Sequence, residues 1–326
     1  VSLEYVDLDY NSLTGSIPDS IGNLTFLQFL DLDTNDLTGC IPHNVGNLHS
    51  IQYLDLSTNA LTGFIPDSIG NLVSLAAFYA GGNFLTGTIP SSIGNLLSLQ
   101  DLYLETNALT GTIMDGVGNL ISLRYLYMYA NALTGTIPNS IGNLENLLIL
   151  DLFNNTLTGA IPESIGTLVN LANLELLGNA LTGTIPKSIG NLLSLQLIYF
   201  DANALTGSIP EDIGNLINLT ALSLDTNFLT ENIPNSIGGL ELIEYLTLYT
   251  NELTGTLPNS VGGFALLNTL DVDNNALTGT IPEGLGLLSL LYYLGLGDNF
   301  LIGNIPAGLG SSNSSKFFDF SSNSLT

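Results

Sequence analysis

Residues 27–48 read LQFLDLDTNDLTGCIPHNVGNL, and this stretch decides the fold of the 326-residue chain. The same pattern returns every 24 residues without insertion or deletion, with an asparagine in each copy from Asn11 to Asn323. A fixed period of this length predicts a solenoid, in which each coil buries its apolar side chains only against neighbouring coils. We therefore expect one elongated domain of about 13–14 coils over residues 1–326.

The first half of the pattern predicts a strand followed by a turn. Leu30 and Leu32 alternate with Phe29, Asp31 and Asp33, which is the period of a half-buried strand. Stacked coils place such strands in one parallel sheet, about 4.8 Å apart. The asparagine after each strand has a predicted structural role, because a buried amide can satisfy backbone donors and acceptors where the chain turns.

The second half reads Thr-Gly-x-Ile-Pro-x-x-Ile-Gly-Asn-Leu and predicts a short edge strand followed by a helical turn. All twelve prolines of the chain fall in one column of the repeat. Proline fixes φ and lacks an N–H, so it suits the start of a helical turn. The glycine four residues later is typical of the end of a short 3₁₀ or α turn.

The complete pattern, L-x-x-L-x-L-x-x-N-x-L-T-G-x-I-P-x-x-I-G-N-L, resembles the plant-type leucine-rich repeat of receptor-kinase ectodomains and secreted polygalacturonase inhibitors. The resemblance covers nearly the whole chain. It implies an α/β solenoid, a leucine-rich-repeat superhelix with a parallel β-sheet on the concave face, a second short β-sheet, and 3₁₀ or short helical turns on the convex side. It also implies a recognition module that is secreted or lies at the cell surface.

The two ends depart from those families, which usually carry cysteine-paired caps. Cys40 is the single cysteine, so no internal disulfide can form. The last repeat, about residues 307–326, is degenerate and has serines in two leucine columns. The first coil has no N-terminal cap, which predicts a bare strand edge that another chain could cover.

The charge is strongly acidic: 29 acidic residues oppose 3 basic residues, for a net charge of −26. Nucleic acid is excluded as a partner, because phosphates need lysine and arginine to release their counterions. The apolar runs are too short for direct membrane insertion. Cations and basic partners fit the charge. Four glycosylation sequons are compatible with secretion, and they begin at Asn23, Asn154, Asn218 and Asn313.

Five aspartates on the outward side of the first three predicted strands form the sharpest acidic cluster. They are Asp7, Asp9, Asp31, Asp33 and Asp55. Residues two apart share a strand face at roughly 7 Å, and the next strand is about 4.8 Å away. A hard cation with oxygen ligands would relieve the repulsion, and Ca²⁺ tolerates irregular geometry. The alternative is a solvated acidic face with diffuse counterions.

A second cluster is aromatic, and it is the predicted ligand-binding site. Tyr79, Tyr103 and Tyr127 occupy one column on successive strands. Such tyrosines either stabilise a sheet by cross-strand pairing or form a platform for a sugar or a partner's side chains. The basic residue beside them would orient an acidic group or pair with an aspartate. The full predicted set is Tyr79, Tyr103, Tyr125, Tyr127, Tyr129, Asp101, Glu105 and Arg124.

These features predict an extracellular module that binds a protein or glycan through an acidic, tyrosine-rich concave face, with Ca²⁺ as a candidate cofactor. The bare first coil favours an alternative, in which end-to-end self-association builds a filament, matrix or cell-surface assembly. A minor alternative is ice binding, because Thr-Gly-Thr pairs such as Thr110 and Thr112 resemble the ice-binding face of some antifreeze solenoids. An enzyme is not predicted, since open solenoid surfaces rarely exclude water as acid–base chemistry requires.

Overall fold

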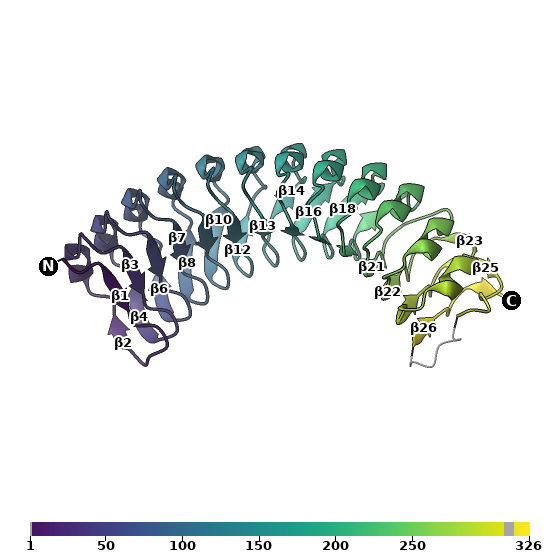
Figure 1. The fold of residues 1–326 in the computed structure, drawn as a ribbon, viewed down its shortest axis with the longest axis horizontal. Coiled ribbons are helices and arrows are strands. Elements are labelled where there is room, and N and C mark those ends of the chain that lie inside the picture. Colours follow the sequence, from purple (N-terminus) through teal and green to yellow (C-terminus); the bar gives the residue numbers. More distant parts are fainter. Residues whose placement is uncertain (1, 310–315) are drawn as a thin grey trace. The chain divides into compact units, whose positions relative to one another are not determined.

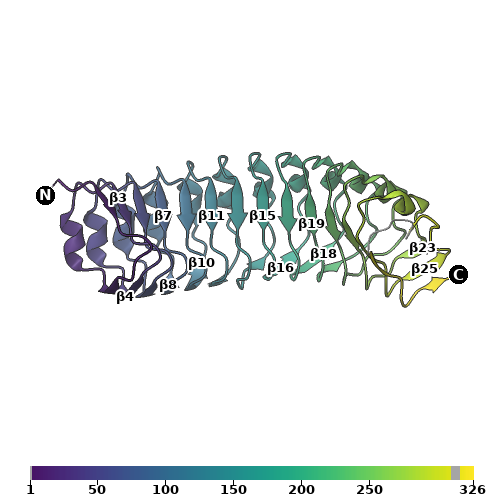
Figure 2. The ribbon, with the colours of Figure 1, turned by 60° about the horizontal axis from the view of Figure 1, so that its bottom comes forward.

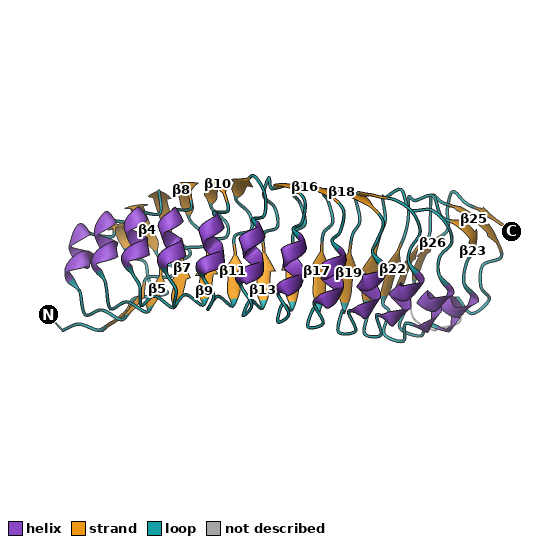
Figure 3. Ribbon diagram, turned by 90° about the horizontal axis from the view of Figure 1, so that it is seen from above, coloured by secondary structure: helices purple, strands orange, loops and turns teal. Residues whose placement is uncertain are grey.

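The computed structural model describes residues 2–309 and 316–326. The chain forms two compact units, Val1–Thr158 and Gly159–Thr326. In both units a coil contributes one strand to a main parallel sheet, and most coils add a short strand of a second sheet and a 3₁₀ helix. Within each unit the 3₁₀ helices and the strands lie on different sides of the coils (Figure 3). The predicted fold class is confirmed.

In the first unit the strands of the main sheet follow chain order, so consecutive coils are parallel neighbours (Figures 1 and 2). These strands are β1 (Tyr5–Asp7), β3 (Phe29–Asp31), β5 (Tyr53–Asp55), β7 (Ala77–Tyr79), β9 (Asp101–Tyr103), β11 (Tyr125–Tyr127) and β13 (Ile149–Asp151). The second sheet contains β2 (Thr14–Ser16), β4 (Asp36–Cys40), β6 (Ala60–Gly63), β8 (Phe84–Thr88), β10 (Ala108–Thr112) and β12 (Ala132–Thr134). The 3₁₀ helices are η1 (Asp19–Asn23), η2 (His43–Asn47), η3 (Asp67–Asn71), η4 (Ser91–Asn95), η5 (Asp115–Asn119) and η6 (Asn139–Asn143).

The second unit repeats this order, and β14 (Thr158–Gly159) lies at the boundary. Its main strands are β15 (Asn173–Glu175), β17 (Leu197–Tyr199), β19 (Ala221–Ser223), β21 (Tyr245–Thr247), β22 (Thr269–Asp271), β24 (Tyr293–Gly295) and β26 (Phe317–Asp319). Short strands are β16 (Ala180–Gly183), β18 (Ala204–Gly207), β20 (Phe228–Leu229), β23 (Thr278–Thr280), β25 (Phe300–Gly303) and β27 (Ser324–Leu325). The 3₁₀ helices are η7 (Glu163–Thr167), η8 (Lys187–Asn191), η9 (Glu211–Asn215), η10 (Asn235–Gly239), η11 (Asn259–Gly263) and η12 (Glu283–Leu287).

In internal coils, the asparagine after the main strand joins its coil to the coil before it. The side-chain amide of Asn35 donates to three backbone carbonyl oxygens, including Leu8 of the previous coil at 2.9 Å. Its carbonyl oxygen accepts from the N–H of Leu13, also at 2.9 Å. The same four bonds recur at Asn59 and, in the second unit, at Asn203. The predicted structural role of this column is confirmed.

The Thr-Gly-Thr pairs also hold adjacent coils together. The hydroxyl of Thr86 donates to the carbonyl oxygen of Gly63 in the previous coil at 3.3 Å. The methyl carbon of Thr88 packs over Gly111 of the next coil, where a Cβ would approach that carbon to 2.7 Å. Gly111 also has a positive φ of 76°. The threonine columns therefore have a structural role in cohesion between coils, whatever else they do.

Departures from the repeat are accommodated without a change of fold. Met114 replaces proline and keeps its backbone, with φ −72° and ψ 146° against −69° and 141° at Pro42. Glu231 replaces glycine and takes the left-handed conformation, with φ 64°. The degenerate last coil still forms β26 and β27, which pair with β24 and β25. The single-domain boundaries 1–326 and the uncapped first coil stay predictions.

Candidate functional site

The outward side of the main strands in the first unit, hereafter the strand face, carries a continuous row of aromatic rings. Each ring lies 4.3–6.3 Å from the next, measured between ring centroids. We call this row the aromatic ladder; in order it consists of Tyr5, Phe29, Tyr53, Tyr79, Tyr103, Tyr127, Tyr129 and Phe153. The ladder crosses every main strand from β1 to β11 and ends just after β13.

The ladder changes both column and ring geometry as it crosses the unit. Tyr5, Phe29 and Tyr53 occupy the first outward position of their strands and stack face to face, with interplanar angles of 8–9°. Tyr79 and Tyr103 occupy the second outward position and meet edge to face, at 82°. Each ring between the two ends of the ladder therefore contacts a ring on both sides. The ring edges that stay exposed form part of the strand face.

Acidic side chains flank the ladder and receive hydrogen bonds from its hydroxyl groups. Tyr79 donates to Asp101 at 2.8 Å. Tyr53 donates to Asp55 at 3.1 Å and reaches Asp31 at 3.4 Å. Burial and the neighbouring carboxylates raise the pKa of Tyr53 and Tyr79 above the usual range. These hydroxyls therefore stay protonated near neutral pH and hold the carboxylates in place.

Glu105 lies over a gap in the strand face. Gly81 on the preceding coil has no side chain, and a Cβ there would collide with the Glu105 carboxylate. Among the described residues, Oε2 of Glu105 has no hydrogen-bond partner although it is shielded from solvent. Desolvation by burial raises the pKa of this carboxyl. An acceptor in this state gains free energy when a donor reaches it.

The predicted role of Arg124 is only partly consistent with its position. Its guanidinium carbon lies 5.4 Å from the ring centroid of Tyr125, a cation–π contact. The structure shows no pairing with Asp101, whose carboxylate instead accepts from Tyr79. Arg124 is exposed and remains available to an acidic group of a partner.

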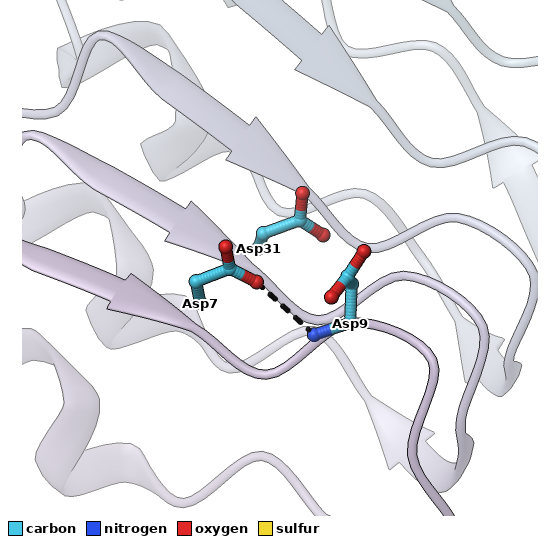
Figure 4. Close-up of side chains that lie close together, drawn as sticks. All are labelled: Asp7, Asp9 and Asp31. Carbon is cyan, nitrogen blue, oxygen red and sulfur yellow. Dashed lines mark hydrogen bonds between the residues drawn. The ribbon is translucent and has the colours of Figure 1, made fainter.

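The acidic cluster is smaller than the sequence predicted. Asp7, Asp9 and Asp31 each place a carboxylate oxygen within 4.8 Å of the others. Figure 4 shows Asp7 and Asp31 at the ends of their strands and Asp9 on the loop that follows β1. Within the described residues, Asp33 and Asp55 lie outside this group. Asp33 accepts from Thr34, and Asp55 accepts from Tyr53 and the Ser57 N–H.

Desolvation and nearby like charges both act on Asp9 in this cluster and on Asp55, which is paired in register with Asp31. Partial desolvation and the charge of Asp7 raise the pKa of Asp9. Desolvation by burial raises the pKa of Asp55, with the charge of Asp31 contributing. Both carboxylates are thus less stable in their charged form than free aspartate, so an approaching positive charge would stabilise them.

The described part of the second unit, residues 159–309 and 316–326, carries acids without a continuous aromatic row. Asp225 is buried and accepts from Ser223 and Thr247 at 2.7 and 2.9 Å, so hydroxyl groups satisfy it. Asp273 accepts from the N–H of Gly297. Desolvation and the charge of Asp271 raise the pKa of Asp273 to about 6. Asp225 is therefore satisfied by neighbouring hydroxyl groups, whereas Asp273 experiences the repulsion of Asp271.

The sequence identified the centre of the ladder but missed its ends. Tyr79, Tyr103, Tyr127 and Tyr129 belong to it, and Tyr125 lies on β11 beside Asp101 in register. The missed rings are Tyr5, Phe29, Tyr53 and Phe153. An available signal was an aromatic residue at the first outward position of three successive strands.

Three of the four predicted glycosylation sites can be located. Asn23 ends η1, Asn154 follows strand β13, and Asn218 lies before β19; all three are exposed. The amide of Asn218 donates to the carbonyl oxygen of Leu193 at 2.8 Å, which a glycan on that nitrogen would disturb. Asn313 lies outside the described residues. Their modification stays a prediction.

The protein families that match this chain are defined by the leucine-rich repeat. A family model described as "Leucine-rich repeat region" matches residues 102–227. A second, "Leucine Rich Repeat", matches residues 2–24, 26–48, 50–72, 218–240 and 266–288. No curated protein gives a match. Within the described residues, no helix has the length and apolar character needed to span a membrane.

Solved structures extend this similarity over nearly the whole chain. A plant peptide hormone receptor, RGFR1, in complex with RGF2 is 40% identical over 99% of this chain, with a TM-score of 0.95. This chain covers 52% of that receptor chain, about half of its length. A plant ice-binding protein is 28% identical, with a TM-score of 0.59, over 78% of this chain and 74% of its own.

A bacterial protein shows that the architecture is not confined to plants. The leucine-rich-repeat protein LIC12759 of Leptospira interrogans is 33% identical over 99% of this chain and 79% of its own, with a TM-score of 0.77. The repeat frame, the sheet order and these similarities agree with one another. The chain therefore belongs to the leucine-rich-repeat family and is similar to plant receptor ectodomains of that family.

Proposed function

We propose that this chain is an extracellular or cell-surface module that binds a protein or peptide through the strand face of its first unit. The observation that carries the proposal is the aromatic ladder. Half-buried rings such as Tyr103 and Tyr127 are fixed by their neighbours and still present an edge. Rigid aromatic side chains provide contact area at little entropic cost, which favours protein recognition.

The ring geometry favours a protein ligand over a glycan. A sugar stacks on the face of an aromatic ring, but the faces of Phe29 are occupied by Tyr5 and Tyr53 at 4.3 Å each. Edges, hydroxyl groups and carboxylates remain for contact. This surface matches backbone and side-chain groups of a peptide better than a flat pyranose ring.

Similarity to a receptor that is solved with a peptide hormone supports the same class of ligand. This chain spans about half of that receptor, so the receptor's own partner is not transferred to it. The proposal concerns a binding surface, not a signalling activity, and it assigns no catalytic role to any residue.

A selection experiment tests the proposal even though the ligand is unidentified. A random peptide library displayed on phage is selected on the intact chain, and the binders are then measured against Tyr103→Ser and Tyr127→Ser. We expect most binders to lose affinity with either variant. Tyr249→Ser in the second unit serves as the matched control, because it removes a tyrosine outside the ladder.

Failure of the selection, or binders that tolerate both ladder variants, would contradict the proposal. Folding of each variant is checked by circular dichroism, because loss of two edge-to-face contacts at Tyr103 also costs stability. A third variant, Tyr103→Phe, keeps the ring and removes only the hydroxyl.

Ice binding is a second candidate, favoured by the similarity to a plant ice-binding protein. Exposed threonines on adjacent strands form close pairs, with Thr88 beside Thr110 and Thr112 beside Thr134. Their packing between coils supplies a structural reason for the same residues. Inhibition of ice recrystallisation at micromolar protein, lost in Thr112→Tyr, would support this candidate, and growth equal to buffer would remove it.

Self-association and calcium binding are two further predictions, and each has a direct test. End-to-end self-association predicts light scattering that grows with protein concentration, and a concentration-independent monomer would oppose it. Calcium at Asp7, Asp9 and Asp31 predicts a small increase in melting temperature when CaCl₂ is added. Three residues leave most of the 6–8 oxygen positions of Ca²⁺ to water, so we expect weak binding.

A further inference from the structure

We infer that the partner of the aromatic ladder is a basic peptide segment, extended across the strands and rich in lysine or arginine. This inference rests on the proposed function and names the class of its ligand. It follows from charge complementarity between the acidic strand face and a basic peptide, and from the length of the ladder.

Carboxylates border the ladder along its whole first half. On β1, β3 and β5 the rings stand at the first outward position and aspartates at the second, in strict register: Asp7 beside Asp31, and Asp31 beside Asp55. On β9 the order is reversed, with Asp101 first and Tyr103 second. An occupant that follows the rings therefore meets a carboxylate on β1, β3, β5 and β9, whereas β7 and β11 carry none.

Cations to balance these acids are scarce on the protein itself. Arg124 is one of only three basic residues in the chain, and it lies over Tyr125 rather than beside an aspartate of the ladder. Tyrosine hydroxyls give the aspartates hydrogen bonds but no neutralising charge. A lysine or arginine from a partner would supply both a donor and a charge, and its aliphatic stem would lie along ring edges.

Glu105 adds an independent reason to expect a donor from outside. Its Oε2 has no hydrogen-bond partner among the described residues, and it lies in the middle of the ladder, between the coils of Tyr79 and Tyr103. Rotation of the Glu105 side chain away from Gly81 would expose Oε2 to solvent at the strand face, where a basic side chain could donate a hydrogen bond to it.

The dimensions set the length of the occupant. Seven strands at about 4.8 Å give a span of about 29 Å. An extended chain advances about 3.3 Å per residue, so about nine residues cover the ladder. Alternate side chains of such a segment point the same way, so basic residues at every second position would all face the acids.

The test uses a fluorescein-labelled nonapeptide with lysine at alternate positions and alanine between, and its glutamate counterpart. Fluorescence anisotropy is measured with the intact chain at low and at moderate salt. We expect saturable binding of the lysine peptide, weaker at higher salt, and none of the glutamate peptide. Absence of lysine-peptide binding, or binding that salt leaves unchanged, would overturn the inference.

A pair of double variants separates local contact from the general field of an acidic protein. Asp31→Asn with Asp55→Asn neutralises two acids beside the ladder and keeps the acceptor oxygens used by the Asp33 and Ser57 N–H groups. Asp19→Asn with Asp67→Asn makes the same charge change on exposed residues of η1 and η3. We expect about a tenfold loss of affinity for the first pair only. Equal losses would show a nonspecific field and refute the docking surface.

The two proposals fail in different ways. If the peptides selected by display are neutral or acidic and still require Tyr103, the proposed function stands and the preference for basic segments falls. If the lysine nonapeptide binds Tyr103→Ser and Tyr127→Ser as tightly as it binds the unsubstituted chain, the ladder is not its binding site. The inference is then wrong, whatever peptides the phage selection yields.

Discussion

The two units share one repeat frame and differ on their outward side. In the first unit the outward positions of consecutive strands carry eight contacting rings. Among the described residues of the second unit, the main strands show one stacked pair across strands, Tyr293 with Phe317. Inward positions are buried leucines and related residues in both. The inward residues of the repeat therefore determine the fold of each unit, and the outward residues determine which partners each unit can contact.

Removal of a buried asparagine should damage both units alike and has the largest expected effect. Asn59→Ala and Asn203→Ala each delete four hydrogen bonds and leave backbone groups unsatisfied. We expect each variant to lose about 3 kcal/mol of unfolding free energy. Urea denaturation measures the loss. A much smaller loss in one unit would break the claim that the frame is equivalent in both.

Removal of a ladder ring should affect the first unit more than its counterpart affects the second. Tyr103→Ala deletes two edge-to-face contacts, at 4.7 and 4.6 Å between centroids. We expect a loss of about 1–3 kcal/mol from the contacts alone. Tyr249→Ala in the second unit removes a tyrosine bonded to Asp225 instead of a ring pair. Equal losses in urea denaturation would mean that the ladder adds no stability of its own.

Glycine at position 231 should stabilise the second unit. Glu231 has φ 64°, in a column where glycines such as Gly207 have φ near 74°. A side chain in this region costs about 1–2 kcal/mol, so Glu231→Gly should raise stability by about 1 kcal/mol after its own entropic cost. The matched change in the first unit, Gly111→Glu, should lower stability. A rise in melting temperature for Gly111→Glu would contradict the role assigned to this column.

Acidification should stabilise the second unit through Asp273. Its pKa is raised to about 6, so the folded state binds more protons than the unfolded state between about pH 4 and 6. Stability is therefore highest below that window and falls as the pH rises through 6. Asp273→Asn should flatten this dependence and keep the bond from the Gly297 N–H. The measurement is melting temperature against pH, with Asp19→Asn as the control.

Calcium should act on the first unit and has the smallest expected effect. Saturating CaCl₂ should raise the melting temperature by a few degrees at most, about 1 kcal/mol. Asp31→Asn should abolish the rise, because it removes one carboxylate of the group around Asp7 and Asp9. Asp271→Asn in the second unit should leave the rise intact. A rise that persists in Asp31→Asn would place the ion elsewhere.

The repeat predicted whatever depends on position within a coil. Leu30, Leu32 and Asn35 have the same surroundings as their equivalents in other internal coils, so their burial and hydrogen bonds follow from the frame alone. The shared column of Tyr79, Tyr103 and Tyr127 was predictable for the same reason, because strict register places them side by side.

Features that depend on the identity of a neighbour could not be predicted. The ladder shifts from the first to the second outward position between Tyr53 and Tyr79, and only the ring contact at 5.4 Å shows that it continues. Glu105 leans over Gly81 because that coil happens to lack a side chain there. Asp33 and Asp55 were predicted to join a metal cluster, but within the described residues the group of close carboxylates contains only Asp7, Asp9 and Asp31.

The asparagine bonds also bear on how such a chain can change in length. Each amide joins only its own coil and the coil before it, so a whole 24-residue unit could be duplicated or deleted by recombination without leaving an amide unmatched. Insertion of a single residue would break the same bonds at once. Lineages of this chain are thus expected to grow and shrink in complete coils, and such an event within residues 5–153 would change the number of coils that the row of rings crosses.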